Sequence, residues 1–190
     1  MYNYTTKNRY QIVLVYYNLI IMKKILFIAL CLLDHSAFPQ QPTVESKEKE
    51  QINLLLDAWH KAAAQAKSND YFDALTENAI FIGTDATEHW DKTAFKAFAK
   101  PYFDKGQAWD FKPLERHIYF SNDKNTAWFD ELLDTWMKIC RGSGVVVKVG
   151  NQWKIQHYVL STTIPNESID EVVKIKTPTE NPLIQKLQTR

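Results

Sequence analysis

The second half of the chain constrains the fold most, because everything after Gly106 has the pattern of antiparallel strands. Segments rich in aromatic and β-branched residues follow one another, and short turns at 122–125 and 150–151 separate two of the pairs. The expected strands, the first bent near Pro113, are 109–120, 126–136, 140–150 and 152–163. This pattern predicts a sheet in which consecutive strands pair with each other.

The preceding part of the chain has helical spacing. Ile52, Leu56, Trp59 and Ala63 recur at three- and four-residue intervals, which predicts a helix over 45–67. A second, short helix is expected over 70–76, a short apolar strand over 79–83 and a further helix over 91–104. Helices followed by a run of strands predict an α+β fold in which N-terminal helices pack on one face of a mostly antiparallel sheet.

This order of elements resembles the nuclear transport factor two-like superfamily, and specifically its SnoaL-like branch. The residues that carry the resemblance are AIFIGTDATEHW at 79–90, AWFDE at 127–131 and GNQWKIQHYVLS at 150–161, and the resemblance covers about 51–165. It implies a cone-shaped α+β barrel, in which the helices pack in the concave face of a curved sheet and leave a conical pocket. It also implies a homodimer formed through the sheet. It implies no particular reaction, because the fold hosts isomerases, dehydratases, cyclases, ligand binders and dimerisation modules.

The ends of the chain differ from the expected domain, which spans 45–165. Met22 and the two lysines after it precede the short apolar run ILFIALCLL, which is typical of a secretory signal peptide and too short to span a membrane. We interpret 22–38 as that signal peptide and 1–21 as an upstream extension from a mis-assigned start. The mature chain is then secreted or periplasmic, and 166–190 is a polar, loosely attached tail.

Composition excludes several partners. The net charge of +1 gives no electrostatic case for binding nucleic acid. The sequence has no phosphate-binding glycine loop and no Cys/His spacing of a zinc site, so neither a metal nor an organic cofactor is implied.

Aromatic residues make up 13% of the chain and include six Trp, which indicates a core or cavity lined with rings. The expected ligand is an unidentified small organic molecule.

Strand alternation predicts which side chains face the cone. Lys154 and Lys148 are taken to mark the outer face of the last two strands, so the residues at odd positions in these strands are expected to point inward. The odd positions of 126–136 are the more apolar set and are also expected inside. The inward residues are then Phe129, Glu131, Arg141, Trp153, His157 and Ser161.

Three ionisable residues, Glu131, Arg141 and His157, would therefore meet on one apolar face. Buried charges need partners, and these three can pair with each other. Three interpretations stay open: a structural polar cluster, a site for a small polar or carbonyl-bearing ligand, and a catalytic acid–base pair formed by His157 and Glu131.

A second candidate site lies in the loop TDATEHW, near the expected mouth of the cone. Asp85, Glu88 and Trp90 are candidate ligand-binding residues there. The alternative is that the polar side chains only cap and solvate the loop, and their adjacency does not fit a metal site. Of Arg116 and His117 on the bent strand, one is expected to point inward. Arg116, which would share a face with Ile118 and Phe120, is also a candidate ligand-binding residue. His60 is expected at the solvent edge of the first helix.

Two apolar residues, Tyr158 and Leu160, fall on the face that Lys154 marks as outer. An exposed ring beside a leucine favours a partner surface, and we expect a homodimer through this convex face. The alternative is that the C-terminal tail covers it. The chain is thus expected to be a small-molecule-binding protein or cofactor-free enzyme, and the alternative is a non-catalytic dimerisation module with a self-filled aromatic core.

Overall fold

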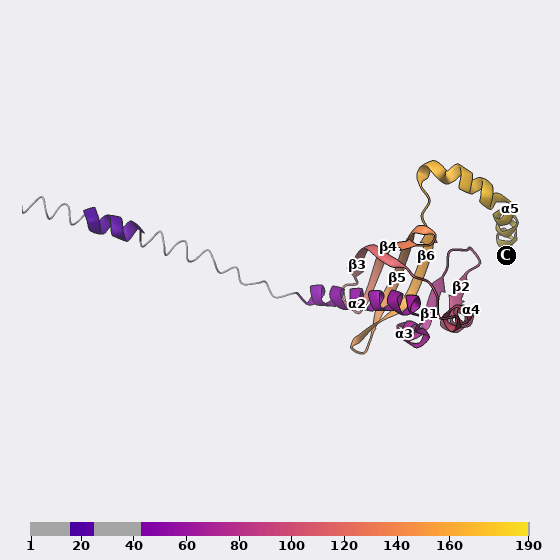
Figure 1. The fold of residues 1–190 in the computed structure, drawn as a ribbon, viewed down its shortest axis with the longest axis horizontal. Helices are drawn as coiled ribbons and strands as arrows, with labels where there is room; N and C mark the ends of the chain where they lie inside the picture. The colour runs from indigo at the N-terminus through magenta and orange to yellow at the C-terminus, as the bar shows by residue number, and fades with distance from the viewer. Residues whose placement is uncertain (1–15, 25–42, 190) are drawn as a thin grey trace, which may run out of the picture. The chain divides into compact units, whose positions relative to one another are not determined.

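The structure, a computed structural model, describes residues 16–24 and 43–189. The chain divides into two units, Met1–Thr43 and Val44–Arg190, each of which is described by itself (Figure 1). In the first unit, residues 16–24 are helical and exposed. Most of the predicted signal peptide, including its cleavage site, lies outside the described residues. Within the described ranges, no helix has the length and apolarity needed to cross a membrane.

The second unit is built on one sheet with the strand order β2-β1-β6-β5-β4-β3. All neighbouring strands are antiparallel except β1 and β6, which are parallel. The five predicted strands are present, but the first begins at Leu75, where the short helix was expected to continue, and an additional edge strand, β2, forms at the end of the predicted loop. The strands are β1 (Leu75–Ile82), β2 (His89–Asp91), β3 (Lys112–Phe120), β4 (Thr126–Thr135), β5 (Lys138–Val149) and β6 (Gln152–Thr162).

The helices α2 (Val44–Ala64), α3 (Ser68–Asp73) and α4 (Lys92–Asp104) pack on this sheet (Figure 1). The apolar stripe of α2 is buried as the spacing predicts, and α4 begins where the Asp91 carboxylate accepts a hydrogen bond of 2.8 Å from the Ala94 amide. The predicted α+β class is confirmed: helices cover one face of a curved, mostly antiparallel sheet.

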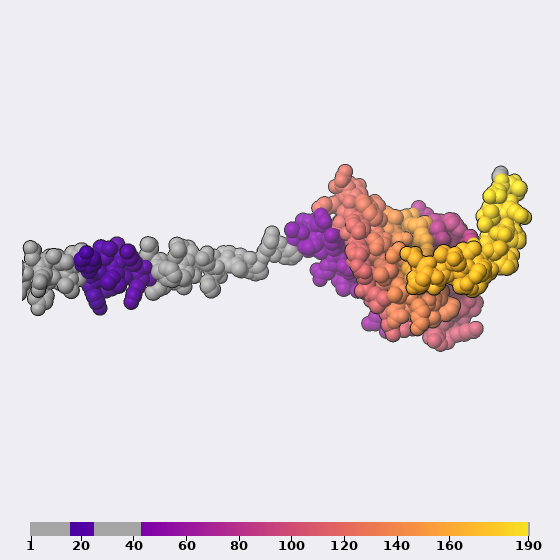
Figure 2. Space-filling view, turned by 90° about the horizontal axis from the view of Figure 1, so that it is seen from above, coloured from indigo at the N-terminus to yellow at the C-terminus, as the bar shows by residue number. Residues whose placement is uncertain are grey.

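Aromatic rings fill the space between the helices and the sheet. Phe81 stacks on Phe95 with ring centroids 3.9 Å apart, and Trp59 stacks on Tyr71 at 4.9 Å. Phe103 and Phe129 are also buried here. The face of the domain seen in Figure 2 is continuous, with the side chains of α2 and of the strands in contact. The predicted ring-lined core is therefore present.

The polar C-terminal segment forms a short 3₁₀ turn, η1 (Asn166–Ser168), and a helix, α5 (Ile169–Gln188). Pro178 and Pro182 lie inside α5, and none of its residues is buried. Ile169 and Val173, two apolar residues through which the tail could have covered the sheet, are exposed. The tail is thus helical and does not bury its apolar residues against the domain.

The predicted facing of β6 is wrong beyond Ile155, because the strand contains a bulge. Val145 pairs with His157 whereas Val146 pairs with Ile155, which leaves Gln156 as an extra residue without a partner opposite. Tyr158 and Leu160 therefore point inward and are 1% and 6% exposed. The other residues after the bulge, His157, Val159 and Ser161, lie on the outer face.

The predicted facing of β5 is also wrong, for a different reason. Lys148 was taken to mark the outer face, but it lies on the inner face, where its ammonium donates to Glu48 of α2 at 2.8 Å and lies 5.2 Å from the centre of the Trp153 ring. A lysine can do this because its long apolar stem spans a buried wall while its charge finds a partner at the edge. The alternation is thus reversed, and Arg141 is exposed.

Candidate functional site

The centre of the candidate site is Glu131. Strand β4 places this residue on the inner face of the sheet, between the buried side chains of Phe129 and Leu133. Glu131 is only 1% exposed, so its carboxylate is held away from bulk water. A buried carboxylate is costly unless it is paired and hydrogen-bonded, and the surroundings of Glu131 show how this cost is met.

Three side chains from three different elements converge on Glu131. His60 of α2 contacts Oε1 through its Nε2 at 2.8 Å, and the Tyr158 hydroxyl of β6 donates to the same oxygen at 3.0 Å. Arg116 of β3 donates from Nε to Oε2 at 2.9 Å, and its Nη2 forms an ion pair with that oxygen at 2.8 Å, although its angle is too poor for a hydrogen bond. Each carboxylate oxygen therefore has two partners.

These contacts set the charge of the site. Burial is the largest effect on Glu131 and raises its pKa, but the hydrogen bonds and charges of His60 and Arg116 together outweigh it and lower the pKa below the ordinary 4.5. For Tyr158, burial and then the charge of Glu131 raise the pKa well above 10.0. At neutral pH the site therefore holds an ionised Glu131 and a neutral Tyr158 hydroxyl.

The ionised state of Glu131 fixes how His60 is protonated. A carboxylate only accepts hydrogen bonds, so the Nε2 of His60 carries the hydrogen that points to Glu131. In the neutral ring, Nδ1 then holds a free lone pair, and it has no hydrogen-bond partner among the described residues. A carboxylate behind an imidazole orients the ring and stabilises the imidazolium that forms when Nδ1 takes up a proton.

Arg116 ties the site to the helix layer. Its Nη1 donates to the Asn53 side chain at 3.1 Å and to Asp57 at 2.9 Å, both on α2. The side chain of Arg116 is 7% exposed, whereas the side chain of Asp57 is 56% exposed. The guanidinium of Arg116, on the edge strand β3, thus contacts both the buried carboxylate of Glu131 and the Asn53 and Asp57 side chains of α2.

Gly142 of β5 leaves the room that the cluster needs. A Cβ atom at this position would lie 2.2 Å from the Tyr158 hydroxyl and 3.0 Å from the Glu131 Cγ. No other residue allows Tyr158 to reach Glu131 across β5 without a shift of either side chain. The glycine is therefore required for close approach between side chains.

The structure brings only part of the predicted site together. Glu131, Phe129 and Trp153 point inward as predicted, and the choice left open between Arg116 and His117 is decided for Arg116. The predicted inward orientation of Arg141, His157 and Ser161 is wrong: Arg141 and Ser161 are exposed, His157 is partly exposed on the outer face, and the predicted cluster with Glu131 is not formed. Arg116 takes the place predicted for Arg141, and His60 takes that of His157.

His60 was misplaced at the solvent edge of its helix and is 4% exposed. The sequence did contain a signal for it. His60 lies four residues after Leu56 and eight after Ile52, so it continues the buried stripe of α2. The identity of its partner was not available from the sequence, because Glu131 is 71 residues away.

The TDATEHW loop bonds mainly to itself. The Asp85 carboxylate accepts from the amide and hydroxyl of Thr87 at 2.8 and 2.6 Å, and Glu88 accepts from the Asp85 amide at 3.2 Å. The Thr87 hydroxyl, followed by its amide, lowers the pKa of Asp85. Trp90 packs on Phe98, with centroids 4.5 Å apart. These contacts favour the loop-capping interpretation over a ligand site.

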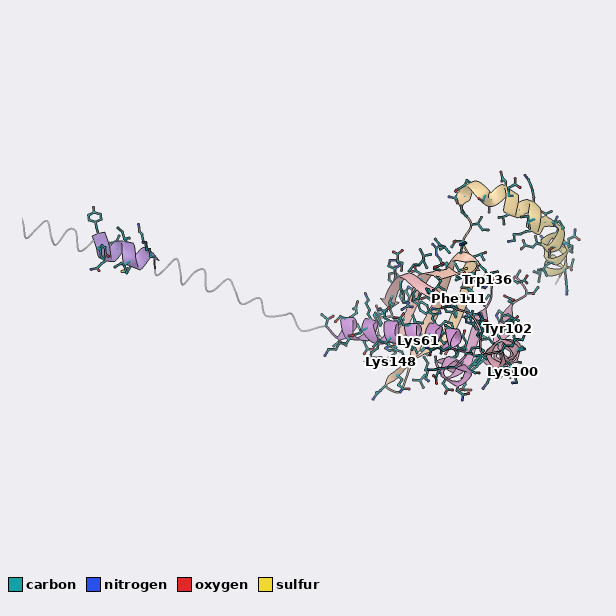
Figure 3. The ribbon with its side chains drawn as sticks, in the orientation of Figure 1. Lys61, Lys100, Tyr102, Phe111, Trp136 and Lys148 are labelled. Carbon is teal, nitrogen blue, oxygen red and sulfur yellow. The ribbon has the colours of Figure 1, made fainter. Side chains whose placement is uncertain are left out.

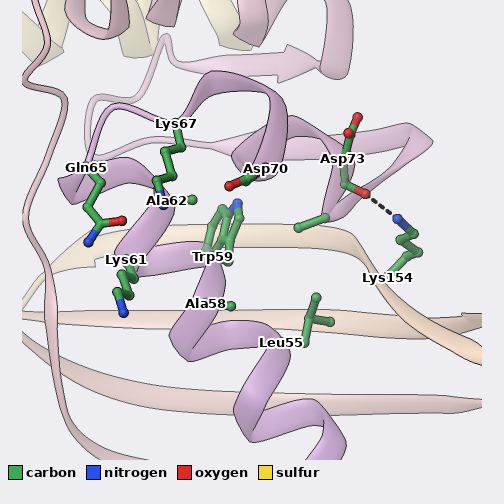
Figure 4. A pocket seen from close by; sticks show the side chains of 11 residues that line it. Leu55, Ala58, Trp59, Lys61, Ala62, Gln65, Lys67, Asp70, Asp73 and Lys154 are labelled. Atoms are coloured by element: carbon green, nitrogen blue, oxygen red, sulfur yellow. Dashed lines mark hydrogen bonds between the residues drawn. The ribbon is translucent and has the colours of Figure 1, made fainter.

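A separate pocket of about 440 Å³ lies between α2 and α3 (Figure 4). Its apolar lining comes from Leu55, Ala58, Trp59, Ala62 and Ala74. Charged side chains surround this lining, namely Lys61, Lys67, Asp70, Asp73 and Lys154. In the described ranges, no group of three or more His, Cys, Asp or Glu is placed to hold a metal ion.

Comparison with known proteins gives the same family as the fold. No curated protein matches this chain in sequence. An NTF2-like dehydratase from Streptomyces avermitilis, so named provisionally, superposes with a TM-score of 0.57 at 10% identity, over 64% of this chain and 100% of that one. A cystatin-like domain of unknown function from Nostoc punctiforme superposes with a TM-score of 0.57 at 16% identity, over 76% and 99%.

A third solved structure, an NTF2-like protein of unknown function from Pseudomonas putida, has a TM-score of 0.53 at 15% identity, over 65% of this chain and 92% of that one. At these identities the superpositions show the fold alone. The sequence profile of the SnoaL-like domain matches residues 52–165, which is more than half of the chain. The chain therefore belongs to the SnoaL-like domain family.

Proposed function

We propose that this chain binds a small organic molecule in its cone at the cluster of Glu131, His60, Tyr158 and Arg116, and that His60 accepts a proton from this molecule. The observation that supports the proposal most is the 2.8 Å contact between the buried Glu131 carboxylate and the Nε2 of His60. This contact leaves Nδ1 as the basic atom of the ring. The dehydratase name given to a fold neighbour is compatible with such chemistry.

The expected chemistry is abstraction of a proton next to a carbonyl group, as in an isomerisation or a dehydration. The proton moves from the ligand to Nδ1 of His60, and the electron pair of the broken bond stays on the ligand as an enolate. Glu131 stabilises the imidazolium that results, and Arg116 keeps Glu131 ionised and in place. No step requires a metal or an organic cofactor.

The test is a binding screen with small carbonyl-bearing compounds, monitored by protein NMR, on the wild type and two histidine variants. In His60→Gln the ring is lost but a hydrogen bond to Glu131 can be kept, so we expect hits to weaken at least about tenfold. His157→Gln on the outer face is the matched control and should leave every hit unchanged. Equal binding by the wild type and His60→Gln, with both folded, would refute the proposal.

A second candidate function is a non-catalytic interaction module whose cone is filled by its own side chains. The stacked rings of Trp59, Tyr71, Phe81 and Phe95 favour it, because they occupy the space between helices and sheet. Under this alternative, the Glu131 cluster is a structural network. A screen in which no compound perturbs the amide signals around Glu131 would favour the module.

We also propose that the chain is exported, since Met22 and the two lysines after it precede a short apolar run. N-terminal sequencing of the exported protein should find a mature chain that begins near Phe38. A retained N-terminus at Met1 would contradict export by this signal.

A homodimer through the outer face of the sheet is likewise proposed, now on different residues from those the sequence suggested. Tyr119 and Trp128 stack at 6.0 Å and are 46% and 47% exposed, on the face opposite to the buried Tyr158. Trp128→Lys should yield monomer in light scattering. Trp136→Lys, in the exposed β4–β5 turn, is the control and should leave the dimer intact (Figure 3). A monomeric wild type would refute the dimer.

A further inference from the structure

We propose that the pocket between α2 and α3 is a second binding site, separate from the Glu131 cluster, and that it takes a small zwitterion with an apolar body, such as a free aliphatic amino acid. The pocket lies on the other side of Trp59 from the cluster. The Trp59 ring lines the pocket, and it also contacts the rings of His60 at 5.1 Å and Tyr158 at 4.7 Å.

Trp59 supplies the first observation that points to a ligand. Its side chain is 2% exposed, and its indole N–H has no hydrogen-bond partner in the described part of the chain. A buried donor without an acceptor is costly and uncommon in folded proteins. Figure 4 shows the indole nitrogen on the side of the ring that faces Asp70, within the circle of lining residues. An oxygen atom of a ligand seated there, after a small shift of the exposed Asp70 or Lys67 side chain, satisfies it.

The charges around the pocket supply the second observation. Lys61 and Lys67 come from the end of α2 and the turn after it, while Asp70 and Asp73 come from α3. Figure 4 places the two lysines on one side of Trp59 and Asp73 on the other. Within the described residues the side chains of all four form no ion pair with each other.

Lys67 at the N-cap of α3 and Asp70 in its first turn lie close to each other on the side of Trp59 where the indole nitrogen is, and they match a ligand that carries both charges close together (Figure 4). The carboxylate of such a ligand fits Lys67 and the Trp59 N–H, and its ammonium fits Asp70. The fifth charged residue, Lys154, is already engaged, because its ammonium donates to the backbone carbonyl of Asp73. A ligand with only one charge would leave either Lys67 or Asp70 without a partner.

The lining and size limit the body of the ligand. Leu55, Ala58 and Ala62 of α2 offer a strip of small aliphatic groups, and the pocket holds about 440 Å³. Pockets of a few hundred Å³ accommodate small metabolites. A branched aliphatic side chain lying on this strip would bury apolar surface next to the charged end of the ligand, where one carbon carries both the ammonium and the carboxylate, as in leucine.

Three probes of nearly equal shape test the proposal: L-leucine, 4-methylpentanoate without the amine, and 3-methylbutylamine without the carboxylate. Binding is followed through the six Trp indole N–H signals in nitrogen-15 NMR spectra of the domain. The Trp59→Phe variant identifies the Trp59 signal. We expect leucine to shift that signal, leave the signal of the exposed Trp136 in place, and bind at least about tenfold more tightly than either single-charge probe.

Variants of the charged residues complete the test. Lys67→Met and Asp70→Asn should each weaken leucine at least about tenfold, whereas Lys100→Met on α4, outside the pocket, should have no effect. The site is refuted if leucine at about 10 mM produces no saturable shift of the Trp59 signal. The zwitterion is refuted if 4-methylpentanoate binds as tightly as leucine, or if Asp70→Asn leaves leucine binding unchanged.

Discussion

Replacing Glu131 by glutamine tests whether the buried cluster holds the fold together as its geometry implies. Glu131→Gln keeps the shape of the side chain but removes its charge and one of its two acceptor oxygens. The new amide NH₂ group must then face a donor: either Arg116, or His60 and Tyr158. If the NH₂ group faces Arg116, two donors point at each other, whereas His60 and Tyr158 can accept from it once the ring changes tautomer and the hydroxyl turns. In either orientation the buried guanidinium of Arg116 loses its principal counter-charge.

The expected loss of unfolding free energy follows from these contacts. Removing one partner of a buried ion pair costs about 3–5 kcal/mol. Glutamine keeps one hydrogen bond, and Arg116 keeps its contact with Asp57, whose side chain is 56% exposed and therefore compensates weakly. We therefore expect about 3 kcal/mol, which lowers the melting temperature of a domain of this size by about 10 °C or more.

Urea unfolding at pH 7 measures this loss. The control is Asp130→Asn, the next residue on the same strand, whose contact with His117 is exposed at the outer face and whose loss should change stability by less than about 1 kcal/mol. A loss below about 1 kcal/mol for Glu131→Gln, with an unchanged urea dependence, would refute the argument that the buried carboxylate anchors the cluster.

The pH dependence of the same pair of proteins gives an independent check. The pKa of Glu131 is lower in the folded chain than the ordinary 4.5, so its charge stabilises the fold above pH 4.5, and this contribution is lost as the pH falls through the folded pKa. The stability difference between the wild type and Glu131→Gln should therefore be largest at pH 7 and shrink at acidic pH. A difference that grows on acidification would contradict the lowered pKa.

Two smaller changes probe the same cluster. Tyr158→Phe removes the 3.0 Å hydrogen bond to Glu131 and should cost about 1 kcal/mol in urea unfolding, well below the cost of Glu131→Gln. Gly142→Ala places a methyl group 2.2 Å from the Tyr158 hydroxyl and should cost about 1–3 kcal/mol by the same measurement, while Ser143→Ala beside it should be close to neutral.

The sequence was sufficient for the architecture, because the architecture depends on patterns within single elements. The apolar residues of α2 recur at helical spacing and predict a helix, and the alternating segments after Gly106 predict paired strands. The order of these elements then restricts the fold to a helix layer on one sheet. Glu131 was placed correctly for the same reason: its strand β4 is regular, and its neighbours Phe129 and Leu133 mark the inner face.

The residues that contact Glu131 could not be predicted from such patterns. Correct placement of each depends on a position where a polar residue or a bulge breaks the regular alternation or helical spacing. Lys148 carries its charge on the inner face of the sheet. Because a lysine is expected on the outer face, the prediction exchanged the inner and outer residues of β5. His60 is a polar residue on a buried stripe, and only the carboxylate opposite explains why it is tolerated there. The pattern of polar and apolar positions is thus least informative about the facing of polar residues that pair with each other inside the core.

The bulge in β6 is the departure with the largest consequence, and deletions can test it. Gln156 is the extra residue, so removing it restores regular alternation and keeps Tyr158 and Leu160 facing inward. The expected cost is about 1–2 kcal/mol, because the Thr76 hydroxyl loses its 3.0 Å bond to the Gln156 side-chain carbonyl, and the Asn78 carbonyl loses the 3.4 Å bond that the Gln156 amide donates.

Deleting Val159 instead does not preserve the facing of the strand, because it turns the buried Leu160 outward and Ser161 inward. The loss of a buried leucine alone costs about 2–5 kcal/mol, so this chain should be strongly destabilised or unfolded in circular dichroism. The two deletions lie three residues apart in one strand and differ only in whether they follow or break the facing of Tyr158. If both chains unfold equally, the facing of β6 is held by something other than this single extra residue, and the bulge does not explain why Tyr158 reaches Glu131.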